Sequence, residues 1–359
     1  MKILVVSNMY PSKQFPSYGI FVKNFCNQLD ELNFSYSLSV MKKSKNKIGK
    51  LIGYLSFSLL TFCKCLFTDY DIVYIHYASH SSISVILAAL FRKIRIYTNV
   101  HGSDVVPENK KQKKMQKYTN KILSLSEKII VPSEYFKDYV QLKYAVPSDK
   151  LFVSPSGGVD SKVFYKEDMV KNASDVFRVG FVSRISYKKG WDTFIDACSL
   201  LEDKNFEFII VGNGPEMGLM QEKISEKGIE DRIRYYDLLP QDKLRTVYNE
   251  IDVFVFPTER EGESLGLVAL EAMACGRPVI ASDYAAPAKY VVDGVNGFKF
   301  EMGNPTHLAD KLESFRTLSK EKRKELEDGA ILTAKQYDKE KVKEGIKNII
   351  LGYSNDKSN

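Results

Sequence analysis

Short runs of β-branched and aromatic residues alternate along the chain with longer segments in which apolar residues recur every three or four positions. The first pattern predicts buried strands, and the second predicts amphipathic helices. Regular alternation of the two is typical of βαβ units, which build parallel sheets covered by helices. The sequence therefore predicts an α/β fold.

Eleven strands are expected, more than one open sheet of ordinary size holds, so the pattern predicts two sheets. The expected strands are Lys2–Ser7, Ser35–Val40, Ile72–His76, Ile94–Val100, Lys128–Val131, Arg178–Val182, Glu207–Val211, Ile233–Tyr236, Val253–Phe256, Pro278–Ala281 and Gly297–Phe300. Helical periodicity is clear at Ile20–Leu32, Ser82–Phe91, Trp191–Leu201 and Leu265–Ala274. After about residue 305 the pattern is helical to the end, with a polar break near Gln336–Asp338.

A length of 359 residues suits two domains of ordinary size. The turn-rich segment Ser154–Asp160, followed by the polar stretch Tyr165–Asp175, is the expected linker. We therefore expect an N-terminal domain over 1–160 and a second domain over 161–338, with a final helix at about 339–359 that packs back on the first.

The composition is that of an ordinary globular protein, with 44% hydrophobic and 27% charged residues. Five scattered cysteines give neither a disulfide framework nor a zinc-ligand spacing, which favours a reducing cytoplasm. The N-terminal apolar run is short and is interpreted as a strand, not as a signal peptide. The longer apolar stretch Leu51–Phe67 is interrupted by Lys64 and is not expected to span a membrane.

Charge is unevenly distributed between the two halves. Residues 1–150 carry 22 Lys and Arg against 10 Asp and Glu, whereas the remainder carries 30 against 35. The basic half indicates an anionic partner, either nucleic acid or a phospholipid surface. Lysines at 42–50 beside the apolar 51–67 stretch, with a second patch at 110–117, favour an anionic membrane that carries a lipid-linked acceptor. Nucleic acid is disfavoured because no docking motif is present. The alternative is a buried helix with solvated lysines nearby.

Chemistry is expected in the strand-to-helix turns, because doubly wound folds bind ligands at the carboxyl ends of their strands. The densest turn lies in 257–278, where a helix with its first turn expected at Leu265–Val268 would present backbone N–H groups to a phosphate. Glu263 and Glu271 would lie roughly 12 Å apart along this helix, too far for a hydrolytic carboxylate pair. Each could instead hold a hydroxyl-bearing end of one elongated ligand; a capping glutamate and a surface glutamate are the alternative.

Five other turns carry candidate residues or motifs. Arg184 and Lys189 follow a strand and could neutralise a diphosphate, although solvated basic residues also occur at such turns. The glycine turn that begins at Gly212 only superficially resembles a dinucleotide fingerprint, and we interpret it as a tight turn. His101 directly follows a strand and would face the expected cleft, although a structural, hydrogen-bonded histidine is the usual explanation there. Gly19 would let the backbone approach a ligand closely, although simple turn geometry explains it equally well. Asp69 and Asp71 have the D-x-D form of a metal site but precede a strand, so we interpret them as a solvated turn.

These motifs together resemble glycosyltransferase family 4, whose members are retaining, nucleotide-sugar-dependent enzymes of the GT-B fold. The resemblance rests on Arg184, Lys189 and the Glu263/Glu271 pair, together with the run at 266–282. Further motifs follow in the family's order at 19–22, 101–104, 156–160 and 211–215. It implies two Rossmann-like domains that face each other across a cleft.

The resemblance also implies roles for individual residues. Glu271 would hold the donor ribose, and Arg184 and Lys189 the diphosphate. Glu263 and the backbone of Ser264, Leu265 and Gly266 would meet hydroxyls of the transferred sugar, and His101 would lie near it. The amides of Leu267 and Val268 would meet phosphate. Gly19 would approach the diphosphate from the other domain, and the base would rest by Gly212 and 236–239, including Leu238. Two departures are Asp237, where the family often has glycine, and a single glycine in the first loop.

The expected protein is a cytoplasmic glycosyltransferase at the inner face of the cell membrane. It would move a sugar from a UDP- or GDP-sugar to a glycan or lipid-linked acceptor in surface polysaccharide biosynthesis, with no metal or other cofactor. Cations and amides that meet the departing diphosphate would supply the catalysis. Two alternatives remain: a nucleotide-sugar hydrolase or epimerase of the same fold, and a non-catalytic basic scaffold for membrane or nucleic acid.

Overall fold

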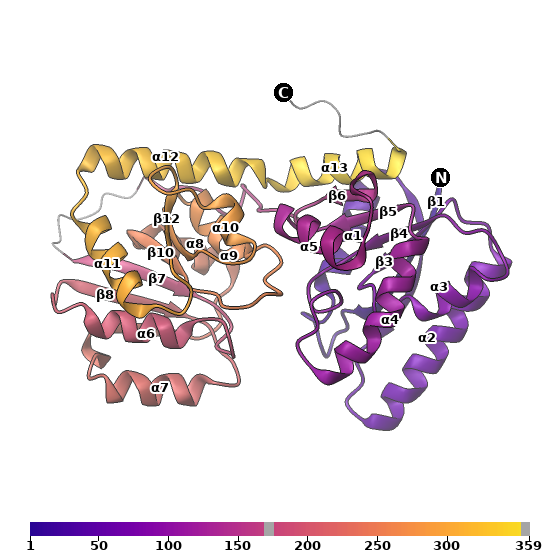
Figure 1. Cartoon of the computed structure of the whole chain (residues 1–359), viewed down its shortest axis with the longest axis horizontal. Helices are drawn as coiled ribbons and strands as arrows, with labels where there is room; N and C mark the ends of the chain where they lie inside the picture. The colour runs from indigo at the N-terminus through magenta and orange to yellow at the C-terminus, as the bar shows by residue number, and fades with distance from the viewer. Residues whose placement is uncertain (169–175, 353–359) are drawn as a thin grey trace. The chain divides into compact units, whose positions relative to one another are not determined.

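The computed structural model describes residues 1–168 and 176–352. It divides the chain into two compact units (Figure 1). Unit 1 comprises Met1–Gly157 and the residues from Val342 onward, and unit 2 comprises Gly158–Lys341. Each contains one six-stranded sheet, which confirms the predicted α/β fold. Of the polar stretch expected at 165–175, residues 169–175 lie outside the described part of the chain.

The sheet of unit 1 has the strand order β2-β1-β3-β4-β5-β6, with all neighbours parallel. Its strands are β1 (Lys2–Tyr10), β2 (Ser35–Lys42), β3 (Ile72–His76), β4 (Ile96–Asn99), β5 (Lys128–Val131) and β6 (Leu151–Val153). Strand β3 is buried along its whole length, as the continuous apolar run Ile-Val-Tyr-Ile-His requires for a strand covered on both faces. Because the chain adds β2 on one side of β1 and β3 on the other, the winding reverses between β1 and β3.

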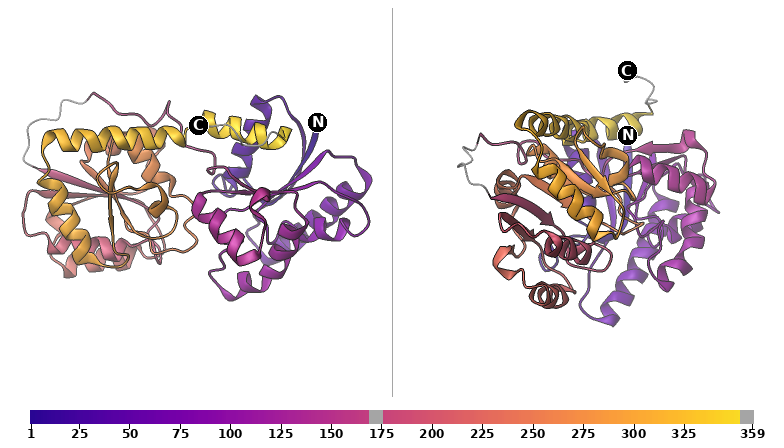
Figure 2. Two further views of the ribbon diagram at one scale, coloured as in Figure 1. Left: turned by 45° about the horizontal axis from the view of Figure 1, so that its top comes forward. Right: turned by 60° about the vertical axis from the view of Figure 1, so that its left-hand side comes forward.

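Helices cover both faces of this sheet (Figures 1 and 2). They are α1 (Ile20–Glu31), α2 (Lys47–Phe67), α3 (Ile83–Ala88), α4 (Lys110–Leu125), α5 (Glu134–Tyr144) and most of α13 (Lys339–Leu351), with a 3₁₀ turn at Ser148–Lys150. Helix α13 packs Ile346, Ile349 and Ile350 against the same sheet face as α1. Lys128 of β5 also donates from Nζ to the carbonyl of Ile349 at 2.7 Å. The last described helix of the chain therefore completes the core of unit 1.

The sheet of unit 2 has the order β12-β11-β10-β7-β8-β9, again all parallel. Its strands are β7 (Phe177–Val182), β8 (Phe206–Val211), β9 (Ile233–Tyr236), β10 (Val253–Phe256), β11 (Val279–Ser282) and β12 (Gly297–Phe300). The chain builds outward from β7 to β9 and then returns to place β10 beside β7. The winding therefore reverses between β7 and β10, where doubly wound folds bind ligands.

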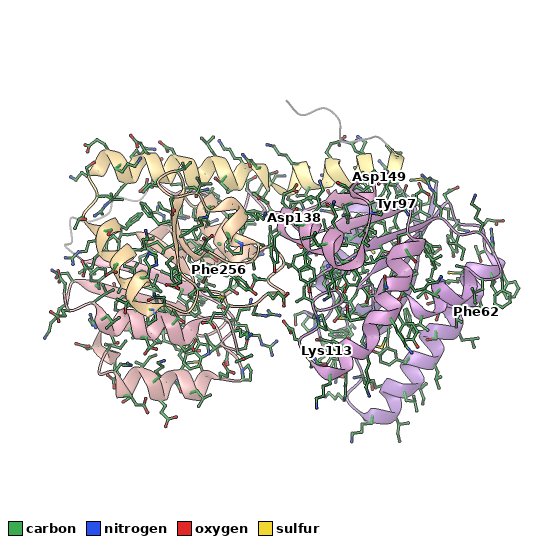
Figure 3. All side chains as sticks on the ribbon, in the orientation of Figure 1. Phe62, Tyr97, Lys113, Asp138, Asp149 and Phe256 are labelled. Atoms are coloured by element: carbon green, nitrogen blue, oxygen red, sulfur yellow. The ribbon has the colours of Figure 1, made fainter. Side chains whose placement is uncertain are left out.

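Helices also enclose the sheet of unit 2, which the left view of Figure 2 shows between them. They are α6 (Trp191–Leu200), α7 (Met217–Glu226), α8 (Gln241–Glu250), α9 (Leu267–Ala274), α10 (Pro287–Tyr290), α11 (Pro305–Arg316) and α12 (Lys320–Gln336), with a 3₁₀ turn at Glu230–Arg232. Aromatic side chains fill both cores: Figure 3 labels Tyr97 of β4 and Phe256 of β10, which are 0% and 2% exposed. A parallel sheet with both faces covered demands such apolar strands.

Strand β6 and the C-terminal helical region differ from the sequence prediction. Strand β6 was missed because its three residues are too few to show any periodicity. The expected continuous helix after residue 305 is interrupted at 317–319, where the Ser319 hydroxyl caps α12 by accepting from the Lys322 amide. The second break, between Gln336 and Lys339, lies where the sequence predicted it.

Candidate active site

The winding reversal of unit 2 brings two predicted site residues into direct contact. Lys189 follows β7 and Glu263 follows β10, and Lys189 Nζ lies 2.6 Å from Glu263 Oε2. Both side chains are largely buried, at 15% and 10% exposure. Thr258 adds a hydroxyl donor to the same carboxylate oxygen at 3.3 Å. A cation and an acceptor that are 74 residues apart in sequence thus form one polar cluster at the carboxyl edge of the sheet.

Backbone contacts lock the two loops that carry this pair. Gly190 has φ +74°, and a Cβ there would lie 1.7 Å from the carbonyl oxygen of Pro257. The amide of Glu259 donates to the carbonyl of Lys188 at 2.9 Å. Only glycine allows so close an approach at a left-handed position. The position of Lys189 is therefore set by backbone geometry and by its partner Glu263 together.

Helix α9 begins later than the sequence predicted. Its first residue is Leu267, because Gly266 at φ +80° lies outside the helical region, so Leu265 belongs to the preceding loop and not to the first turn. The Tyr290 hydroxyl fixes this loop by donating to the carbonyl of Leu265 at 3.1 Å. The free N–H groups of the helix start, which favour anions, therefore begin with Leu267 and Val268, while Ser264 lies in the loop.

Glu271 lies within α9 and contacts Tyr248 of α8. The fully buried Tyr248 hydroxyl donates to Glu271 Oε2 at 3.3 Å. Burial raises the pKa of Glu271 to about 7, and the hydrogen bond from Tyr248 lowers it only in part. A carboxylate held in a desolvated setting is strongly drawn to new hydroxyl donors, which suits the ribose-binding role that the resemblance implies.

The loops after β8 and β9 support each other near the expected base position. Gly212 has φ +146°, and a Cβ there would lie 1.8 Å from the Ser183 carbonyl oxygen. Asp237, which departs from the family pattern, accepts from Asn213 Nδ2 at 2.9 Å and from the Leu238 amide at 2.7 Å. These bonds lower the pKa of Asp237. Leu238 is 75% exposed and so presents an apolar surface to solvent. The base contact itself stays a prediction.

Arg184 is a predicted site residue that does not join the Lys189–Glu263 cluster. Its side chain is exposed, and within the described residues its guanidinium forms no ion pair with the Lys189–Glu263 cluster. It lies in the loop after β7, five positions before Lys189. An exposed guanidinium at a strand end remains available to an anionic ligand.

Gly19 and His101 belong to unit 1, where the winding reverses between β1 and β3. Gly19 precedes α1 at φ +74°, and a Cβ there would lie 2.6–2.7 Å from backbone atoms of Met9 and Tyr10. His101 follows β4, and its Nε2 lies 3.1 Å from Nδ1 of His76 at the end of β3. Burial lowers the pKa of His101 to about 3, so the ring is neutral at physiological pH. Their predicted contacts with a donor remain predictions.

Sequence reasoning missed the residues that hold the candidates in place. Asp104 is fully buried, and its carboxylate accepts from the amides of Ala78, His101 and Gly102 at 2.9–3.0 Å. Its spacing in the His-Gly-Ser-Asp run was visible, but the distant partner Ala78 was not. Tyr248 gave no signal because an aromatic residue in a helical pattern is usually interpreted as core. Thr258 gave none because a single threonine in a polar loop has no distinctive spacing.

The possible metal motif is not part of the site. Asp69 pairs with Arg92, and the Asp71 carboxylate accepts from the amide of Lys2 at 2.6 Å. Across 1–168 and 176–352, no three His, Cys, Asp or Glu side chains gather as metal ligands would.

Comparison with known proteins assigns this chain to a family. Residues 28–161 match the description "Glycosyltransferase Family 4", and residues 166–333 match "Glycosyl transferases group 1". The chain belongs to glycosyltransferase family 4. These two matches cover most of both units, in the order that the motifs predicted.

Relatives and solved structures agree with this assignment. An uncharacterized glycosyltransferase of Methanocaldococcus jannaschii is 28% identical over 286 residues, 78% of this chain and 74% of that protein. The amylovoran biosynthesis glycosyltransferase AmsK of Erwinia amylovora is 25% identical over 251 residues, 67% of this chain and 60% of that protein. The structure of Anabaena HepE in complex with UDP superposes with a TM-score of 0.76 at 18% identity, covering 98% of this chain and all of the other. The GT-B fold is thereby confirmed.

Proposed function

We propose that this glycosyltransferase moves a sugar from a nucleoside diphosphate sugar to a glycan or lipid-linked acceptor in surface polysaccharide synthesis, with retention of anomeric configuration. The observation that carries the proposal is the Lys189–Glu263 pair at the winding reversal of unit 2, close to the loop that leads into α9. A UDP-sugar is the first donor to test, because HepE was solved with UDP. The polysaccharide role draws support from the amylovoran relative.

The chemistry that we propose is electrostatic. As the bond between sugar and phosphate breaks, charge grows on the leaving diphosphate, and groups fixed in advance stabilise it best. Lys189 would exchange its bond to Glu263 for one to phosphate, and Arg184 would supply a second cation. The amides of Leu267 and Val268 would add the field of a helix N-terminus. Glu263, released from Lys189, would accept from a sugar hydroxyl, and no metal is required.

A direct experiment offers the protein UDP-, GDP- and ADP-sugars with and without a polyprenyl-phosphate-linked glycan acceptor, in buffer with and without EDTA. We expect one donor class to raise the melting temperature, since a ligand that binds only the folded state stabilises it. Sugar should reach the acceptor with the donor's anomeric configuration, as NMR of the product can show. Sugar release without acceptor consumption would favour a hydrolase. No response to any nucleotide sugar would favour a scaffold and contradict the proposal.

We further propose that the enzyme works in the cytoplasm against the inner face of the cell membrane, with the outer side of α2 on the lipid. Helix α2 is long and apolar enough to cross a membrane by length and composition, and only 17% of its most apolar stretch is buried. Its inner side, however, is fixed to unit 1: Phe57, Thr61 and Cys65 are buried, and Thr61 Oγ1 lies 2.7 Å from Ser39 Oγ. These contacts favour a helix that lies on a membrane over one that crosses it.

The outer side of α2 is a continuous apolar surface. It exposes Ile48, Leu51, Ile52, Leu55 and Leu59 by 57–73%, and α3, which packs against α2, is followed by Leu90 and Phe91 at 71% and 73% exposure. A helix buried in the core, the alternative that the sequence left open, would not expose so many large apolar side chains.

The charge around this surface matches an anionic membrane. Between Glu31 and Asp104 the only acidic residues are Asp69 and Asp71, while Lys42, 43, 45, 47 and 50 lie at or before the start of α2. Lysines beside exposed leucines combine attraction to anionic headgroups with burial of apolar area.

Vesicle flotation tests this surface. A variant with Leu51, Leu55 and Leu59 each changed to Ser should bind vesicles of phosphatidylglycerol and phosphatidylcholine at least tenfold more weakly, since each buried leucine contributes about 1.5–3 kcal/mol. Leu142→Ser is the matched control, because Leu142 on α5 is 84% exposed but lies outside the surface. Pure phosphatidylcholine and high salt should weaken wild-type binding. Equal flotation of the triple variant and wild type would contradict this placement.

A further inference from the structure

The two histidines at the carboxyl edge of the unit 1 sheet are hydrogen-bonded to each other. His76 ends β3 and His101 follows β4, with Nδ1 of His76 lying 3.1 Å from Nε2 of His101. The hydrogen bond needs one proton between these two nitrogens, so the protonation of one ring fixes that of the other. The resemblance implied a role for His101 but none for His76.

Aromatic rings from α1 and β3 hold the pair in place. Phe21 packs on His101 with ring centroids 4.2 Å apart, and Phe25, one turn later, meets His76 edge-on at 4.8 Å. Tyr74 lies 5.0 Å from His76 on the same strand. His76 is 1% exposed, so neither its ring nor its hydrogen bond is free to rearrange. Packing thus leaves the proton position as the one variable.

The surroundings of His76 settle which nitrogen carries the proton. Within the described residues, its second nitrogen, Nε2, is buried and has no hydrogen-bond partner. Burying an N–H donor without an acceptor is rarer in proteins than leaving an acceptor unpaired. The proton of His76 therefore belongs on Nδ1, from which it is donated to His101. Since His101 then accepts at Nε2, its own proton lies on Nδ1.

We propose that His76 is a positioning residue, which donates its Nδ1–H to Nε2 of His101 and thereby holds His101 in the tautomer that carries its proton on Nδ1. This inference rests on the proposed function and on the place near the transferred sugar that the resemblance implies for His101. A neutral ring fixed in this form can donate to a sugar oxygen from Nδ1 only. Burial lowers the pKa of both rings, of His76 well below 6.5, so the pair remains neutral and does not exchange its roles with pH.

Two-bond proton–nitrogen NMR spectra of the wild-type protein, labelled in its four histidines, read the tautomers directly. Signals of the two rings are assigned from His76→Asn and His101→Ala. We expect the Nδ1–H form for both rings. The Nε2–H form for His76 would overturn the proposal, whatever the enzyme's activity proves to be.

Kinetics separate positioning from packing. In His76→Leu, which fills the space but has no donor, kcat should fall about tenfold with little change in the donor KM, as expected for one lost hydrogen bond. His76→Asn keeps an N–H donor and should recover most of the loss. Tyr74→Phe keeps the ring but removes the hydroxyl that accepts from Asn99 Nδ2 at 3.1 Å. It is the control for disturbance of the same cluster and should keep the wild-type kcat. If asparagine restores no more activity than leucine, His76 serves packing only and the proposal fails.

Activities of the His101 and His76 variants distinguish the role of His101 from the positioning role of His76. If His101→Ala transfers sugar at the wild-type rate, the role that the resemblance implies for His101 is wrong, although the tautomers seen by NMR still stand. If His101→Ala is inactive while His76→Leu keeps full kcat, the proposed function survives and the positioning role of His76 is overturned.

Discussion

Burial alone can shift the pKa of a residue in this protein, without a charged neighbour. Glu271 illustrates this, because desolvation raises its pKa to about 7 while its main partner is a neutral tyrosine. The sequence showed Glu271 and its spacing from Glu263, and the resemblance implied its role. It could not show Tyr248, since a contact between two helices depends on how α8 and α9 pack, which no local pattern reveals.

Glu271 should make stability depend on pH. The native protein holds a proton at this site that the unfolded chain, with a pKa near 4.5, has lost, so the free energy of unfolding should fall as pH rises from about 4.5 through about 7. Glu271→Gln has no ionisable group at this site and removes this dependence. The free energy of unfolding of the variant relative to wild type should therefore increase between about pH 4.5 and pH 7 and then stay constant. Urea unfolding of both proteins between about pH 5 and pH 8 measures the difference. Parallel curves would show that Glu271 ionises normally.

At the scale of elements, type and order were predictable, but several ends were not. The strand β10 and helix α9 were visible as apolar runs, whereas the helix start was placed two residues early. Leu265 and Gly266 continue the helical pattern, but Gly266 takes φ +80° because Phe256 and Tyr290 close around it. Tertiary contacts decide such boundaries, and the same holds for β6, which forms only because β5 lies beside it.

Gly266 therefore should not tolerate a side chain. A Cβ there would lie 2.6 Å from Cε1 of Phe256 and would also be strained at φ +80°. We expect Gly266→Ala to lower the free energy of unfolding by at least about 1–2 kcal/mol and to weaken UDP binding, because the start of α9 shifts. Gly218→Ala in α7, where nothing lies within 4 Å, should instead stabilise by about 0.5–1 kcal/mol. Chemical denaturation of both variants checks the contrast, and equal stability of Gly266→Ala and wild type would refute it.

On the scale of the whole molecule, the chain forms two units, and both ends of the described chain belong to unit 1. It leaves unit 1 after Gly157, completes unit 2, and returns at Val342 to finish the core of unit 1. The helical pattern after residue 305 and the polar break at Gln336–Asp338 indicated a returning helix. Only the structure shows that the isoleucines of this helix share one buried cluster with Ile3, Tyr74 and Tyr97.

The returning helix should therefore be essential to unit 1. Ile346 is 3% exposed, and Ile346→Ala should cost roughly 2–5 kcal/mol of unfolding free energy through lost burial and the cavity that remains. Leu351→Ala on the same helix, at 44% exposure, should change stability by no more than about 0.5 kcal/mol. Hydrogen exchange should show the loss of protection in β1 and β3 of unit 1. An unchanged exchange pattern there would mean that α13 contributes little to that core.

The central claim is that Lys189, held beside Glu263, receives the diphosphate of the donor. Calorimetric titration of UDP into wild type, Lys189→Gln and Lys188→Gln tests it most directly, because Lys188 is the adjacent lysine but is exposed. The account predicts that Lys188→Gln binds as wild type, whereas Lys189→Gln binds about 10- to 100-fold more weakly, the value of one charge-assisted contact. Equal affinity of all three proteins for UDP would contradict it.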